Sequence, residues 1–94
     1  MRVKWTSHAK LHLADIRKYI EVNSSHFAQR TIDRIMARAK QITLFPYSGS
    51  IVPEYGNPDI REIIEGSYRI IYRKKGNNIE IVALIHGARL LPPL

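Results

Sequence analysis

The sequence predicts an α+β fold in which a two-helix hairpin packs on one face of an antiparallel sheet. Two amphipathic helical patterns occupy the first half of the chain, and three strand patterns separated by short turns occupy the second half. A short alternating segment at residues 1–6 adds a first strand, so the expected element order is β-α-α-β-β-β. A chain of 94 residues has the size of one domain, so residues 1–94 are expected to form a single unit.

Both predicted helices show one apolar stripe with helical spacing. In the first helix, which Thr6 or Ser7 is expected to cap, the stripe consists of Ala9, Leu13, Ile16 and Ile20. The segment 21–25 then breaks the pattern with capping residues, and Pro46 ends the second helix. The stripe of that second helix consists of Ala28, Ile32, Ile35, Ala39 and Ile42. The short connection between the helices favours an antiparallel hairpin.

The three C-terminal strands are predicted at residues 60–65, 68–73 and 79–86. Gly66 and Ser67 suit a two-residue type II′ turn, which would place Glu65 opposite Tyr68 and fix the register of the first pair. The last strand is apolar on both faces over residues 81–85, which is typical of a strand in the middle of a sheet. The preceding segment 46–59 holds three prolines and two glycines, so we expect a functional or mobile loop there and no strand.

Composition favours a binding partner with negative charge. The chain carries 15 Lys and Arg against 8 Asp and Glu, a net charge of +7, which suits a polyanion or an acidic protein. It has no cysteine, so disulfides and thiolate metal sites are excluded. The first twenty residues lack a secretory apolar core, and the longest apolar run, residues 81–85, is too short to cross a bilayer. We therefore expect a cytoplasmic protein without a membrane partner.

The strand register also predicts the composition of the two sheet faces. Side chains alternate along each strand, so one face should show Arg61, Ile63, Glu65, Tyr68, Ile70 and Tyr72. The other face should show Ile60, Glu62, Ile64, Arg69, Ile71 and Arg73. Because the helical hairpin covers one face only, the uncovered face is expected to be a docking surface of mixed apolar and cationic character.

Three short motifs in this order resemble the RelE/ParE superfamily of toxins from type II toxin–antitoxin systems. They are the N-terminal pattern of Ala9, Leu13, Asp15, Ile16, Tyr19 and Ile20, the central "SYRIIY" at 67–72, and the terminal "HGARLLP" at 86–92. The resemblance implies a four-stranded antiparallel sheet under a helical hairpin and an antitoxin partner that forms a hetero-oligomer with the toxin. It also implies one of two targets: DNA gyrase in ParE-like members, or ribosome-bound mRNA in RelE-like members.

The ParE-like branch is the favoured interpretation. The RelE-like ribonucleases resemble one another in a lysine-rich second strand and a tyrosine after the last arginine, and this chain has neither, since "LLPPL" follows Arg89. We therefore expect a growth-arresting plasmid-stabilization toxin that inhibits gyrase without a cofactor. The alternatives are a ribosome-dependent mRNA endonuclease and a toxin-fold binding module without toxicity.

The resemblance places the target-binding surface at one end of the sheet, at Arg69, His86, Arg89, Leu90 and Leu91. The ribonuclease alternative would use Arg61, Arg69, His86 and Arg89, because guanidinium groups stabilise a transition-state phosphate and histidine titrates near neutrality. A cross-strand ion pair with Glu62 is an equal alternative for Arg69. The expected antitoxin contacts are Tyr68, Ile70 and Tyr72, with packing under the helices as the alternative. His8 and His12 have no third ligand nearby in sequence, so no metal site is expected.

Overall fold

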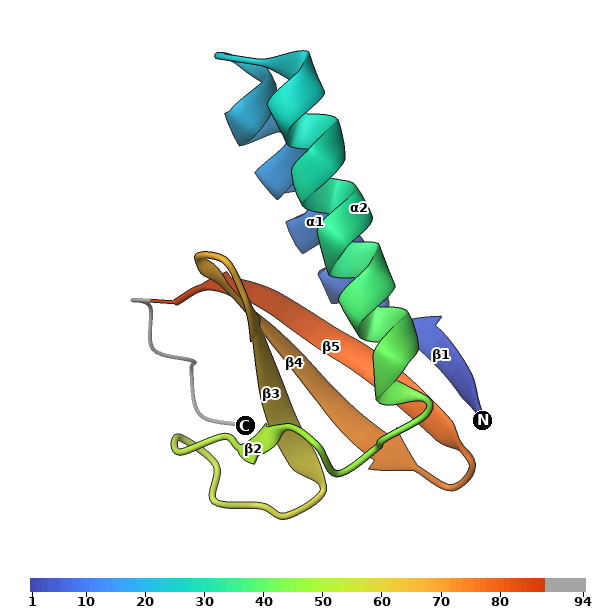
Figure 1. Ribbon diagram of the computed structural model, residues 1–94. Coiled ribbons are helices and arrows are strands. Elements are labelled where there is room, and N and C mark those ends of the chain that lie inside the picture. The colour runs from blue at the N-terminus through green and yellow to red at the C-terminus, as the bar shows by residue number, and fades with distance from the viewer. Residues whose placement is uncertain (88–94) are drawn as a thin grey trace.

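The computed structural model describes residues 1–87 and consists of a helical hairpin above a twisted sheet (Figure 1). Its elements, in chain order, are β1 (Arg2–Trp5), α1 (Ser7–Glu21), α2 (Ser25–Ile42), β2 (Ser50–Ile51), β3 (Ile60–Glu65), β4 (Tyr68–Lys75) and β5 (Asn78–His86). The predicted α+β fold and the predicted order of its main elements are confirmed.

The sheet has five strands in the order β1-β5-β4-β3-β2, which differs from the expectation in two respects. First, β1 pairs with β5 in parallel, so the sheet is mixed and not purely antiparallel. The parallel pairing follows from the helical hairpin, which acts as a crossover between the two strands. Second, the segment 46–59 is not entirely loop, because its residues Ser50 and Ile51 form β2 on the edge of β3. The strand predicted to lie inside the sheet, β5, is indeed flanked by β1 and β4.

The register of β3 and β4 is the one that the turn predicts. Gly66 has a φ of 58°, as the first position of a type II′ turn requires, and Glu65 lies opposite Tyr68. Four residues further from the turn, Arg61 lies opposite Tyr72. The two faces therefore carry the side chains that the alternation predicts.

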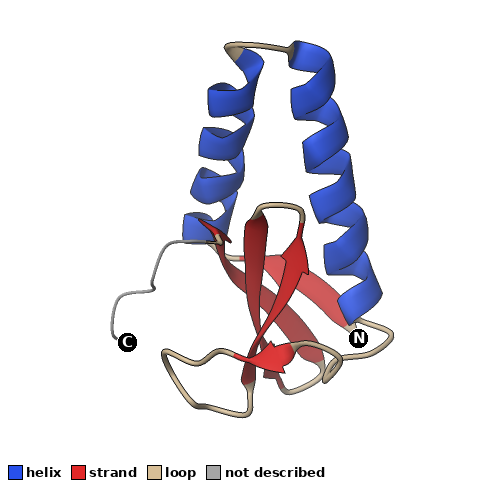
Figure 2. Ribbon diagram, turned by 60° about the vertical axis from the view of Figure 1, so that its left-hand side comes forward, coloured by secondary structure: helices blue, strands red, loops and turns tan. Residues whose placement is uncertain are grey.

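Both helices begin at a side-chain cap. The hydroxyl of Thr6 accepts a hydrogen bond from the backbone N–H of Ala9, and the hydroxyl of Ser24 accepts one from the N–H of Phe27. The buried residues of α2 are the predicted stripe: Ala28, Ile32, Ile35, Ala39 and Ile42. In α1 only Ala9 is fully buried, while Leu13 and Ile16 are partly buried against the main core. Figure 2 shows the two helices side by side above the sheet.

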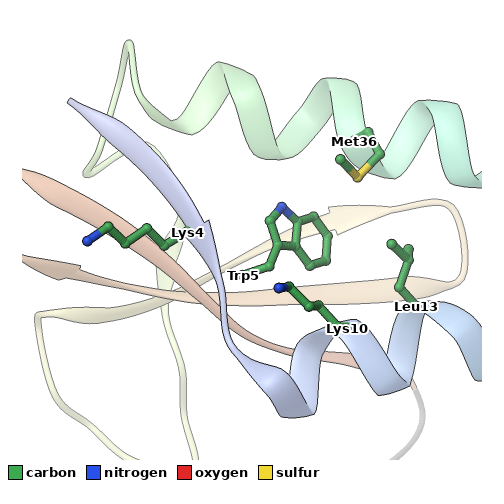
Figure 3. Close-up of a pocket in the computed structure, with 5 residues that line it drawn as sticks. All are labelled: Lys4, Trp5, Lys10, Leu13 and Met36. Atoms are coloured by element: carbon green, nitrogen blue, oxygen red, sulfur yellow. The ribbon is translucent and has the colours of Figure 1, made fainter.

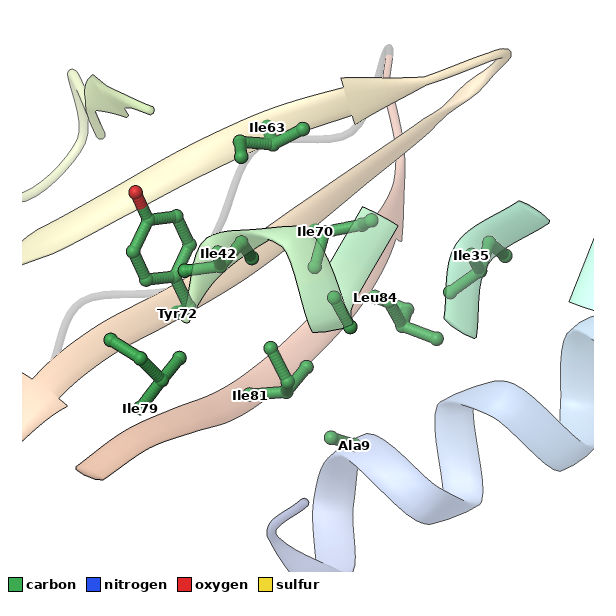
Figure 4. Packing of buried hydrophobic residues seen from close by; sticks show 10 residues of the cluster. Ala9, Ile35, Ile42, Ile63, Ile70, Tyr72, Ile79, Ile81 and Leu84 are labelled. Atoms are coloured by element: carbon green, nitrogen blue, oxygen red, sulfur yellow. The ribbon is translucent and has the colours of Figure 1, made fainter. Parts of the chain in front are cut away.

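The main core lies between the hairpin and the sheet face below it. Figure 4 shows Ile63, Ile70 and Tyr72 of the strands facing Ile35 and Ile42 of α2. Trp5 of β1 is partly buried and packs against this cluster. The face that carries Arg61, Ile63, Tyr68, Ile70 and Tyr72 is therefore the covered one.

The second sheet face is not open along its whole length. A smaller apolar cluster of Val52, Ile60, Ile71 and Ala83 lies there, with Tyr55 packed against it. Val52 and Tyr55 belong to the segment 46–59, which folds under the sheet and covers these residues. The expectation of a fully exposed docking face is therefore corrected, since the long loop supplies its cover.

Candidate functional site

Arg69, the first residue of the expected target-binding surface, is buried. Its residue exposure is 6%. Its Nε donates to Oε2 of Glu62 over 2.9 Å, and its Nη1 donates to Oε2 of Glu54 over 2.8 Å. These carboxylates, above all the hydrogen-bonded Glu54, raise the pKa of the Arg69 guanidinium. The structure thus shows the ion-pair alternative for Arg69, with a second partner from the loop, and leaves the side chain only 7% exposed.

Arg61, a candidate of the ribonuclease alternative, holds the loop to the sheet. Its Nε donates to the carbonyl oxygen of Pro58 over 2.9 Å, and its Nη1 donates to that of Gly49 over 3.0 Å. The guanidinium carbon also lies 5.0 Å from the ring centroid of Tyr47. These contacts give Arg61 a structural role in anchoring the segment 46–59.

His86 is the one described member of the expected target-binding surface that is exposed. Its ring meets Tyr68 edge to face with centroids 6.0 Å apart. Arg89, Leu90 and Leu91 lie outside the described residues.

The candidate residues of the ribonuclease alternative do not converge within the described chain. Arg69 lies on the face opposite Arg61 and His86. On the shared face, Arg61 lies opposite Tyr72 while His86 lies opposite Tyr68, a separation of about 13 Å along the strands. A general base and a phosphate-binding cation must lie within hydrogen-bond reach of the reacting atoms, which this spacing does not allow.

Of the three residues expected to contact an antitoxin, two are buried and one is partly exposed. Ile70 and Tyr72 have no exposed surface and belong to the main core, so packing under the helices is the observed arrangement. The Tyr72 hydroxyl donates to the carbonyl of Pro46 over 2.9 Å and accepts from the N–H of Gly49 over 3.0 Å. Burial raises the pKa of this phenol. Tyr68 alone is partly exposed.

A groove of about 1120 Å³ lies where the hairpin extends beyond the turn end of the sheet, and we call it the hairpin groove. Figures 1 and 2 show both helices rising past the β3–β4 turn. The groove is bordered by α1, by the start of α2, by that turn and by the end of β5. Its apolar lining comes from Ile16, Tyr19, Ile20, Phe27, Tyr68, Leu84 and Ile85.

Two aromatic residues of the hairpin groove are unusually exposed. Tyr19 is 78% exposed and Phe27 is 56% exposed. Neither residue is recognisable from the sequence as a binding residue, because the apolar stripes account only for the helix faces that meet the sheet. No local signal marks them, because both lie near the α1–α2 connection and how far that connection rises past the β3–β4 turn depends on how the layers pack (Figures 1 and 2).

His12 forms part of the floor of the hairpin groove. Its Nδ1 accepts a hydrogen bond from the backbone N–H of Leu84 over 3.2 Å, so the neutral ring carries its proton on Nε2. Burial, together with the nearby charge of His8, lowers the pKa of His12, while Asp15 opposes this shift. Within residues 1–87 no group of three or more potential metal-binding side chains comes together.

A second, smaller hollow of about 550 Å³ lies at the β1 edge of the sheet (Figure 3). Trp5, Leu13 and Met36 form its apolar part, and Lys10 of α1 also lines it. Lys4 borders the hollow from the β1 strand, and its side chain leaves that strand on the side opposite Trp5. It exposes the rim of the main core and contains no acidic side chain.

Within residues 1–87, neither helix has the length and apolar character of a membrane span.

A helical hairpin packed on a mixed sheet, with a groove at one end, defines a small α+β protein. The family model described as "ParE toxin of type II toxin-antitoxin system, parDE" matches residues 3–91. The chain therefore belongs to the ParE toxin family, and its predicted membership of the RelE/ParE superfamily is confirmed.

The fold is similar to that of a solved structure described as the chromosomal ParDE toxin–antitoxin system from P. aeruginosa. The two chains are 24% identical, the match covers 92% of this chain and 95% of the other, and the TM-score is 0.77. At this identity the likeness concerns the fold alone. A comparison with curated proteins gives no match.

Proposed function

We propose that this ParE-family toxin arrests growth by inhibiting DNA gyrase and is neutralised by an antitoxin segment bound in the hairpin groove. Membership of the family, over residues 3–91, is the observation that carries the gyrase part of the proposal. The separation of Arg61, Arg69 and His86 argues against the ribonuclease alternative. The protein acts in this proposal by binding, and it needs no catalytic group.

The antitoxin part rests on the hairpin groove. An apolar groove between helices accepts the apolar face of an amphipathic segment, whose side chains then fill the hollow. Tyr19 and Phe27 are the best anchors for such a segment, since large aromatic side chains dominate binding energies. A net charge of +7 on the toxin favours an antitoxin segment with acidic residues on its solvent side.

Substitution of these anchors tests the groove. We expect Tyr19→Glu and Phe27→Glu to remain toxic but to escape neutralisation, because each places a charge against the bound apolar face. Leu11→Glu is the matched control, since Leu11 is 62% exposed on the same helix as Tyr19 but lies outside the groove lining. Co-expression with the antitoxin should restore growth for Leu11→Glu and for the unmodified toxin only. Neutralisation of all three variants would refute the groove as the antitoxin site.

The order in which syntheses stop after induction tests the target. Inhibited gyrase stops DNA synthesis first, whereas cleaved mRNA stops protein synthesis first. We expect labelled thymidine incorporation to fall before labelled methionine incorporation. The reverse order would contradict gyrase as the target, and unaltered growth would contradict toxicity itself.

A further inference from the structure

Four cations form a regular array at the corner of the sheet where β1, β5 and β4 start or end. The register places Asn78 of β5 between Arg2 and Lys75, and it places Glu80 between Lys4 and Arg73. The result is two cross-strand rows, each with a cation at both ends. We call the four residues Arg2, Lys4, Arg73 and Lys75 the basic corner.

All four side chains leave the sheet on the face opposite the helices. Val3 and Trp5 of β1 pack against the main core, so Arg2 and Lys4, which alternate with them, point the other way. Figure 3 shows Lys4 and Trp5 leaving β1 on opposite sides. In β5, the buried Ile79 and Ile81 alternate with Asn78 and Glu80 in the same manner.

The basic corner has three more positive than negative charges. Its one carboxylate is Glu80, whose Oε1 accepts a hydrogen bond from Nε of Arg73 over 2.6 Å. That contact with Arg73 lowers the pKa of Glu80, partial burial opposes the shift, and the charges of Lys75 and Lys4 reinforce it. Within the described part of the chain, Arg2, Lys4 and Lys75 form no ion pair. All four cationic residues are exposed.

The spacing of the array follows from sheet geometry. Adjacent strands lie about 4.8 Å apart, so the two cations of a row are attached about 10 Å apart, and the two rows are about 7 Å apart along the strands. Long Arg and Lys side chains on this rigid frame reach several charges on one extended anion at once. No apolar side chain belongs to the array, whereas protein–protein interfaces are built around an apolar core.

We propose that the basic corner binds the phosphate backbone of double-stranded DNA. Lys and Arg contacts to phosphates provide sequence-independent affinity and need no base-reading side chain. The choice of DNA over RNA rests on the proposed function, because a gyrase inhibitor meets its target on DNA. The basic corner lies beside the start of β5. The hairpin groove lies at the end of that strand, eight residues further along, or roughly 27 Å. DNA and antitoxin therefore bind at opposite ends of the sheet.

The test is fluorescence anisotropy of a labelled random-sequence DNA duplex titrated with the purified protein over a series of salt concentrations. One variant replaces Arg2, Lys4, Arg73 and Lys75 with Gln. The control replaces Lys10, Lys18, Arg30 and Arg34 with Gln, which removes the same four charges from exposed positions on the helices. We expect the corner variant to lose at least about tenfold more affinity than the control, and its slope of log K against log salt to flatten by about 2–4, at about 0.9 per lost phosphate contact.

A second pair of variants tests the same site in the opposite direction. Glu80→Gln removes the one carboxylate of the array and frees Arg73, so DNA binding should tighten several-fold. Glu21→Gln likewise removes the carboxylate that pairs with Arg17 on α1 and should leave affinity nearly unchanged. Equal loss in both four-residue variants, no gain in Glu80→Gln, or a corner that binds an acidic peptide but not DNA would overturn the inference. Since this assay contains no gyrase, a negative result leaves the proposed inhibition of gyrase standing.

Discussion

Replacement of Arg69 separates a structural role from a target-binding role. Arg69→Met leaves Glu54 and Glu62, each with 15% of its side chain exposed, facing each other without the shared guanidinium. Removal of one partner from a buried ion pair costs about 3–5 kcal/mol, and the residual exposure of the carboxylates favours the lower end. A domain of 94 residues has a stability of about 5–14 kcal/mol, so the variant should be folded but weak. Its melting temperature should fall by about 12–24 °C.

The triple variant Glu54→Leu, Glu62→Leu, Arg69→Met completes the test. An apolar replacement of a whole buried ion cluster is often neutral or stabilising, so urea unfolding should place this variant within about 1 kcal/mol of the original protein. If Arg69 is structural, the triple variant also regains toxicity on induced expression. A triple variant that is stable but not toxic would show that Arg69 contacts the target. A loss below about 1 kcal/mol in the single variant would show that the ion cluster is not buried as described.

Three further predictions concern other residues. Tyr72→Phe removes the hydroxyl that bonds Pro46 and Gly49, so the free energy of unfolding in urea should fall by about 1–3 kcal/mol. The exposed control Tyr19→Phe should lose less than about 0.5 kcal/mol. Equal losses would contradict the anchoring role of Tyr72. Folding lowers the pKa of His12 below 6.5, so its contribution to stability is complete above that pH and declines as the pH falls below it. His12→Asn keeps the acceptor for the N–H of Leu84 but does not titrate. Between about pH 7.5 and about pH 5.5 its urea midpoint should therefore fall less than that of the original protein. An equal fall of the midpoint in both proteins would refute this. Arg89→Ala should weaken growth arrest with an unchanged melting temperature, and full toxicity in that variant would misplace the predicted target surface.

Local patterns determined most of the fold. Gly66 and Ser67 form a two-residue turn, and that turn sets the whole β3–β4 register. The spacing of apolar residues in α2 identified each of its five buried positions. The parallel pairing of β1 was missed because a four-residue strand carries no local signal for its partner or its direction.

The candidate site was less predictable because it depends on contacts distant in sequence. Alternation places Glu62 beside Arg69, but nothing local places Glu54 there, since its position depends on how the segment 46–59 folds under the sheet. For the same reason the uncovered face looked more open in sequence than it is. The hairpin groove depends on how far the helices extend past the sheet, a property of the assembled layers that neither stripe of apolar residues contains.

The most direct test of the proposed function uses purified gyrase, plasmid DNA, ATP and the purified toxin. Inhibition that stabilises the cleaved complex predicts that linear plasmid accumulates with increasing toxin, and that prior addition of antitoxin prevents it. The matched measurement is primer extension on mRNA in a translation reaction, where we expect no toxin-dependent cleavage. Cuts at codon positions in ribosome-bound mRNA, together with no linear DNA in the gyrase reaction, would contradict the proposal.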